Sequence, residues 1–203
     1  MSSLQDQLQQ ETSLNARERI LAVSSENEPL DESVVVLRAE MRLHNLWHRA
    51  TYMLVYHVPT SKSASCDEFN KDTSVLVQRR SQKKDYCPGR LDPTPGGVVA
   101  FGETYEENAI REIEEEMGIQ IDGQRNTLKR LFSFPYQDKN VKVWGEFYEC
   151  VFRGDIEDLT LQESEVEEVI QMPLQELLEM AKHQPELFMP DACHALRIYS
   201  ERK

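Results

Sequence analysis

Several features that would assign this chain to a familiar class of protein are missing or scarce. Its 203 residues contain four cysteines, and none of them is in C-x-x-C spacing: Cys66, Cys87, Cys150 and Cys193. The sequence therefore predicts reduced thiols rather than a disulfide framework or a zinc site.

Long apolar runs and basic stretches are also lacking. No apolar run approaches the ~20 residues that span a bilayer, and the polar N-terminus has no apolar signal core. We therefore expect no membrane partner and a cytoplasmic location. The net charge of −13 argues against binding a nucleic acid polymer, which usually requires a basic stripe. A nucleotide is still compatible, because a metal ion and a few basic side chains can hold its phosphates.

What is present predicts an α/β fold. We expect a flexible N-terminal tail over residues 1–18 and a single domain over 19–203. Apolar, β-branched segments predict strands at 19–24, 49–58, 74–80, 127–137, 141–152 and 167–172, with a hairpin turn at 138–140. Amphipathic patterns predict helices at 105–117 and 174–182 and a last helix capped by Asp191. This order of elements predicts a mixed sheet between helical layers, an α/β/α sandwich.

The helix at 105–117 concentrates acidic residues on one face. Thr104 and Glu107 form a predicted capping box, and Gly118 is a natural C-terminal stop. Within the helix, three glutamates stand at i, i+3 and i+4 and so share a face: Glu112, Glu115 and Glu116. Like-charged carboxylates this close repel one another, and a divalent cation would turn that repulsion into binding. Their oxygens suit Mg²⁺ or Mn²⁺.

The residues around this helix carry a resemblance to a known family. The segment 97–119 reads GVVAFGETYEENAIREIEEEMGI and fits the pattern G-x5-E-x7-R-E-U-x-E-E-x-G-U, in which U is a bulky aliphatic residue. This is the signature of the Nudix family, and every defined position is filled. The resemblance implies a Nudix-type sandwich and hydrolysis of a diphosphate bond in a small molecule, such as a nucleoside diphosphate linked to another group. It leaves a homodimer open.

The resemblance also assigns roles to particular residues. It implies that Glu112, Glu115 and Glu116 bind the metal, that the Gly96 carbonyl is a further ligand, and that Glu103 acts through Arg111. The family's general base lies outside the signature at varying positions. For that role we select Glu165, with Glu146 and Glu163 as alternatives.

Segments flanking the signature resemble the isopentenyl-diphosphate-isomerase-like branch of the family. These segments are 47–50, 76–80, 88–92, 143–145, 161–166 and 188–191. In that branch an arginine and a lysine before the signature bind diphosphate. Adjacent strand residues point in opposite directions, so of Arg79 and Arg80 we select Arg79, together with Lys84.

Two other functions are weighed against hydrolysis. An isomerase carries a catalytic cysteine where this chain has Pro95, which cannot donate a proton. His48 aligns with an isomerase metal ligand, but we interpret it as a buried, hydrogen-bonded histidine. A non-catalytic binding module would have lost a glutamate of the signature, and none is lost. The substrate is not predicted, because loops such as 59–72 and 154–165 determine it.

Overall fold

The computed structural model describes residues 16–31, 35–60, 73–84 and 86–203. Most of the predicted N-terminal tail and of the loop 59–72 lies outside these residues, as does Cys66. The strands are β1 (Arg19–Leu21), β2 (Val35–Leu37), β3 (Trp47–Val58), β4 (Ser74–Arg80), β5 (Leu91–Asp92), β6 (Thr127–Gln137), β7 (Lys142–Arg153) and β8 (Val166–Pro173). The α-helices are α2 (Arg38–Leu43), α3 (Tyr105–Met117), α4 (Leu174–His183) and α5 (Pro190–Arg202), and the short 3-10 helices are Ile156–Asp158 and Pro185–Leu187.

A six-stranded mixed sheet forms the centre of the fold. Its strand order is β5-β4-β3-β7-β6, and β8 pairs with β4. The central pair β3 and β7 is parallel along its whole length, whereas the other pairs are antiparallel. The predicted hairpin joins β6 and β7, and Asp138 Oδ1 accepts the backbone N–H groups of Asn140 and Val141 at 2.7 and 2.8 Å. The prediction of a mixed sheet is confirmed.

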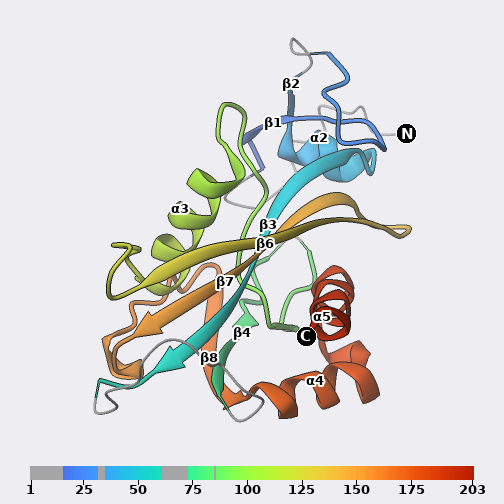
Figure 1. Cartoon of the computed structure of the whole chain (residues 1–203). Helices are drawn as coiled ribbons and strands as arrows, with labels where there is room; N and C mark the ends of the chain where they lie inside the picture. Colours follow the sequence, from blue (N-terminus) through green and yellow to red (C-terminus); the bar gives the residue numbers. More distant parts are fainter. Residues whose placement is uncertain (1–15, 32–34, 61–72, 85) are drawn as a thin grey trace.

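Helices cover both faces of this sheet (Figure 1). On one face α3 buries Ala109, Ile113 and Met117 against β3, β4 and β7. On the other face α4 and α5 cover a larger cluster that includes Leu177, Leu196 and the fully buried Phe147. The predicted α/β/α sandwich is therefore confirmed. In the part of the chain that the structure describes, no helix is long and apolar enough to cross a membrane.

The prediction that Asp191 caps the last helix is wrong. Helix α5 begins at Pro190 with Met189 as its N-cap, two residues earlier than a cap at Asp191 would give. Proline suits the first helical position, because its missing N–H has no helical acceptor there. Asp191 is instead buried inside the first turn, where its Oδ2 accepts a hydrogen bond from the Tyr52 hydroxyl at 2.8 Å. Burial raises the pKa of the Asp191 carboxyl.

A small N-terminal unit, formed by β1, β2 and α2, packs beside the main sheet. The sequence predicted a strand near β1 and missed β2 and α2. The buried residues of the unit are Ile20 and Met41, which pack with Val98 from the segment before α3. A backbone bridge between Ile20 and Ala100 and a 2.7 Å hydrogen bond from Phe101 N to Arg19 O attach β1 to the same segment. The N-terminal unit is thus fixed to the start of the signature.

Candidate active site

Helix α3 has the ends that the sequence predicts. Thr104 is the N-cap, its Oγ1 accepts from Glu107 N at 3.2 Å, and its own N–H donates to Glu107 Oε2 at 2.8 Å. Gly118 ends the helix in the left-handed conformation with φ 71°. These caps fix the two ends of the helix, and the packing of Ala109, Ile113 and Met117 on the sheet fixes its rotation about its axis.

Arg111 connects the acidic residues of the signature. Its Nε and Nη2 donate to the two carboxylate oxygens of Glu103, at 2.7 and 3.1 Å. Its remaining contacts are to Glu112 Oε1 at 3.0 Å and Glu115 Oε2 at 2.8 Å. The bidentate pair with Arg111, helped by Asn108, lowers the pKa of Glu103 to about 2. The structure therefore brings Glu103 and Arg111 together with Glu112 and Glu115.

The three glutamates differ in their surroundings. The Glu116 side chain is only 4 % exposed and that of Glu112 is 12 % exposed, whereas that of Glu115 is 49 % exposed and turned toward Arg111. Gln78 of β4 donates from Nε2 to Glu116 Oε2 at 3.0 Å. Burial, and for Glu112 the adjacent Glu116 carboxylate, raise the pKa of both buried acids. Among the described residues no three acidic, histidine or cysteine side chains converge as a complete metal-binding group.

Gly97 brings backbone close to the buried acid Glu112, and Gly96 lies against Thr51 of β3. A Cβ on Gly97 would lie 2.2 Å from Cδ of Glu112, so only glycine leaves room for this carboxylate. The carbonyls of Pro95 and Gly97 accept from Met53 N and Thr51 N, both at 2.9 Å. Because carbonyls alternate along an extended segment, the Gly96 carbonyl between them points away from β3. The role of this carbonyl as a further metal ligand stays a prediction from the sequence.

Lys84 and the predicted base Glu165 meet at this site. The Lys84 side chain is 8 % exposed, its Nζ contacts the Glu165 carboxylate directly and lies 4.0 Å from Glu116 Oε1. The alternative bases lie elsewhere: Glu146 accepts from Arg130 and from the Tyr148 hydroxyl at 2.7 and 2.6 Å, and Glu163 is exposed. Glu165 is therefore the one of the three candidate bases that reaches Glu116 through a shared contact.

The two adjacent arginines of β4 point in opposite directions, as alternation along a strand requires. Arg80 and Lys84 line a narrow cavity beside Gly96 and Gly97, with a volume of about 40 Å³; we call it the signature cavity. Arg80 is held there by the Tyr86 carbonyl at 2.8 Å and by Asp92 Oδ2 at 3.4 Å.

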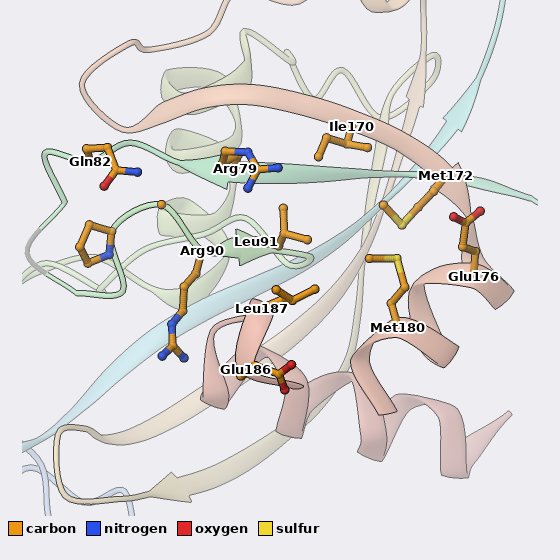
Figure 2. A pocket seen from close by; sticks show the side chains of 12 residues that line it. Arg79, Gln82, Arg90, Leu91, Ile170, Met172, Glu176, Met180, Glu186 and Leu187 are labelled. Atoms are coloured by element: carbon orange, nitrogen blue, oxygen red, sulfur yellow. The ribbon is translucent and has the colours of Figure 1, made fainter. Parts of the chain in front are cut away.

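Arg79 lies on the other side of the strand, paired with Glu168 at 2.6 Å. It lines a larger cavity of about 540 Å³ between β8, α4 and the segment 88–91 (Figure 2). The structure thus separates the predicted phosphate-binding pair Arg79 and Lys84 and places Arg80 with Lys84.

His48 is buried, and its Nδ1 lies 3.0 Å from the Leu46 carbonyl oxygen, in agreement with its interpretation as a hydrogen-bonded histidine. Sequence reasoning missed Gln78, and it missed Arg38 and Arg42, which also line the signature cavity. The i, i+4 spacing of the two arginines was the available signal, because residues so spaced share one face of a helix.

These features define a class: an α/β/α sandwich whose acidic helix places two buried carboxylates against a glycine backbone and a lysine. The chain belongs to the Nudix family, since residues 60–191 match the NUDIX domain. It is 36 % identical over 189 residues to the uncharacterized Nudix hydrolase YfcD of Escherichia coli, a match that covers 93 % of this chain and 90 % of YfcD. The Pseudomonas aeruginosa Nudix hydrolase PA4841 is 31 % identical over 182 residues, which cover 90 % of this chain and 93 % of that protein.

Solved structures share the fold. DR0079 from Deinococcus radiodurans aligns with a TM-score of 0.65 at 23 % identity, over 89 % of this chain and 98 % of that one. The NUDIX domain of Shewanella oneidensis NrtR, solved with ADP ribose, aligns with a TM-score of 0.54 at 16 % identity, over 82 % of this chain and 99 % of that one. The predicted enzyme class, a hydrolase of the Nudix family, is confirmed by the homologues.

Proposed function

We propose that this protein is a metal-dependent hydrolase that cleaves a diphosphate bond in a nucleoside diphosphate linked to another group, or in a similar small diphosphate. The observation that carries the proposal is the buried pair Glu112 and Glu116, one helical turn apart, of which Glu112 is pressed against Gly97. Two ionised carboxylates cost free energy in such a place unless positive charge compensates them. Lys84, at 4.0 Å from Glu116, and Arg111, at 3.0 Å from Glu112, are each shared with other carboxylates and so supply only part of that compensation.

The donor set fits a hard divalent cation. Glu112, Glu116 and the Gly96 carbonyl offer oxygen ligands only, which Mg²⁺ and Mn²⁺ prefer. Glu115 is positioned by Arg111 on the same helical face and completes the predicted set if its side chain turns inward. When bound, such an ion would neutralise charge on the phosphates and lower the pKa of a bound water.

The remaining residues have roles in binding and proton transfer. Lys84 is the basic side chain nearest to the acidic pair, and an ammonium group binds phosphate oxygens as a point charge. Its present partner is Glu165. A substrate phosphate that takes Lys84 would leave the Glu165 carboxylate free to accept a proton from the attacking water. Glu103 and Arg111 act indirectly, by fixing the orientation of Glu112 and Glu115.

We propose that the chain is related by descent to the isomerase-like branch but does not catalyse the isomerase reaction. Pro95 lies within the backbone segment that pairs with β3, where its carbonyl accepts from Met53 N. Cys87 has a raised pKa, chiefly because of burial, and is not among the residues that line the signature cavity. These observations support hydrolysis rather than isomerisation. A cytoplasmic location and a homodimer remain predictions from the sequence.

A panel of diphosphates tests the proposal. Purified protein with Mg²⁺ or Mn²⁺ is given nucleotide sugars, dinucleotides, ADP-ribose, nucleoside triphosphates and isopentenyl diphosphate, and phosphate-containing products are measured. Glu112→Gln and Glu116→Gln should abolish turnover and weaken Mn²⁺ binding measured by calorimetry. Glu114→Gln is the matched control, because Glu114 is an exposed residue of the same helix. Hydrolysis that persists in both active-site variants, or formation of an isomer instead of hydrolysis, would refute the proposal.

A further inference from the structure

Helix α2 lies outside the segment that matches the family and nevertheless reaches the signature cavity. The match begins at residue 60, whereas α2 covers Arg38–Leu43. Met41, which is 1 % exposed, packs on Val98 immediately after Gly97. Backbone hydrogen bonds from Arg38 N to Glu18 O at 2.8 Å and from Ala39 N to Ala16 O at 3.1 Å hold the start of the helix. The helix is therefore fixed in place by its apolar side and by its backbone.

Two arginines of this helix line the cavity, one turn apart. Arg38 is 6 % exposed, and its Nη1 is 2.9 Å from Glu18 Oε2. The Arg42 guanidinium lies 5.1 Å from the ring centroid of Tyr86, a second residue of the cavity wall. Burying an arginine in a cavity wall is uncommon unless an anion compensates it. At Arg38 that anion is the Glu18 carboxylate, which belongs to the same N-terminal unit.

The charges of the cavity wall favour an anionic ligand. Its cationic residues are Arg38, Arg42, Arg80 and Lys84, and its acidic residues are Asp92 and Asp191. Four cations in one small cavity contrast with a chain whose net charge is −13. A cleft lined mainly by one sign of charge concentrates ligands of the other sign. Arg80 is paired with Asp92, whose side chain is 4 % exposed, whereas the Glu18 side chain paired with Arg38 is 21 % exposed and can be solvated when a phosphate displaces it.

We propose that Arg38 and Arg42 bind a second phosphate group of the substrate, the one that is not held at Glu112 and Glu116. The ligand class is a nucleoside diphosphate or a larger molecule that contains one. The Glu18 carboxylate occupies Arg38 in place of phosphate and exchanges with it when the substrate binds. This inference rests on the proposed hydrolase function for the identity of the ligand. It makes the N-terminal unit a part of substrate recognition, although it lies outside the matched domain.

Equilibrium binding tests the inference without requiring turnover. The affinity of ADP and of inorganic diphosphate is measured by calorimetry for the native protein and for Arg38→Gln and Arg42→Gln. Loss of one charge-assisted contact should weaken ADP about 10- to 100-fold in each variant. Arg19→Gln is the matched control, because Arg19 is an exposed arginine of the same unit that lies over Phe101. Its affinity for ADP should equal that of the native protein.

Three further measurements separate recognition from folding and from catalysis. Mn²⁺ affinity should be unchanged in the arginine variants, and any hydrolysed substrate should show a raised KM with kcat preserved. The double variant Glu18→Gln/Arg38→Gln removes both partners, so weak ADP binding in a fully folded double variant excludes an unpaired carboxylate as the cause. The inference is overturned if native protein binds neither ligand or if the variants bind ADP with native affinity. If no compound is hydrolysed but the variants still lose ADP binding, the proposed function fails and the inference stands.

Discussion

Replacing Gly97 with alanine separates the chemistry of the site from the stability of the fold. The added Cβ would lie 2.2 Å from Cδ and from Oε1 of Glu112, and 2.6 Å from Oε2. These atoms are the far end of a flexible side chain, so the carboxylate can move aside without displacing backbone. The φ angle of Gly97 does not lie in the left-handed region, so alanine can adopt the same backbone conformation. The expected result is a folded protein whose Glu112 carboxylate is in the wrong place.

The size of the effect follows from the distance. Ordinary contact begins near 3.4 Å, so the carboxylate must retreat from 2.2 Å by about 1.2 Å. A misplacement of about 1 Å at a reacting site costs roughly 100-fold in rate, or about 2.7 kcal/mol of activation free energy. Stability should change little, because Gly→Ala at a compatible position lowers the entropy of the unfolded chain by the equivalent of about 0.4–1 kcal/mol, which offsets local crowding.

Gly96→Ala is the informative contrast. Its Cβ would lie 2.1 Å from the Thr51 carbonyl oxygen, and its φ of 155° disfavours a side chain. Backbone cannot swing aside, so we expect a loss of about 1–3 kcal/mol, or roughly 2–12 °C in Tm. The assays are thermal unfolding, Mn²⁺ titration and kcat/KM on a substrate found in the panel. Native Mn²⁺ affinity and turnover in Gly97→Ala would show that Glu112 is not required where the structure places it.

Three other substitutions test separate parts of the structure. Glu103→Gln should lower the urea midpoint of unfolding at neutral pH. Arg111 depresses the pKa of Glu103 to about 2, so the stabilisation that the ionised carboxylate provides is complete above the ordinary pKa of 4.5. The difference in stability between the variant and the native protein should therefore vanish as the pH falls toward 2. Asp191→Asn should gain stability relative to the native protein as the pH rises, because burial raises the pKa of Asp191 and the native protein loses stability once this carboxyl ionises. Urea unfolding curves of both proteins at acidic and at mildly alkaline pH measure this gain. A stability difference that stays constant with pH would contradict the prediction. Met41→Ala should lower the free energy of unfolding by about 2–5 kcal/mol, because it leaves a cavity in the buried core of the N-terminal unit. It should also weaken ADP binding, as the α2 arginine variants do. Native ADP affinity in this variant would show that the packing of α2 does not affect recognition.

The sequence predicted the site best where local chemistry determines the structure. Thr104, Glu107 and Gly118 fix the ends of α3 through contacts within a few residues, so the positions of Glu112 and Glu116 on one face followed directly. The pairing of Glu103 with Arg111 was also predictable, since it spans only eight residues. The Asp191 prediction failed because two start signals compete: the chain has Pro190 directly before an acidic residue, and proline took the first helical position.

The positions of Arg79 and Arg80 could not be predicted from the local sequence alone. Alternation along a strand correctly implied that the two side chains diverge, but it does not reveal which face of the sheet either one occupies. That depends on the pairing of β4 with β8 and β5 and on a register shift between Arg79 and Arg80. The sequence of a strand does not by itself determine how the strand pairs with distant strands. Helix α2 was missed for a related reason: it has only six residues, and tertiary contacts through Met41 stabilise it more than its own propensity does.

The electrostatics of the site explain why recognition should extend into a unit outside the matched domain. Glu112 and Glu116 occupy the buried face of α3, and Lys84 is already shared between Glu116 and Glu165. The carboxylates of Glu112, Glu116 and Glu165 already offset the charge of one lysine and one divalent ion, so a diphosphate adds negative charge that this set does not balance. Further cations must therefore come from the remaining walls, and Arg80 is committed to Asp92 and a backbone carbonyl. The α2 arginines are the remaining positive charges of this wall, so changes in α2 should alter the affinity for phosphate-rich substrates while the acidic helix continues to determine the reaction.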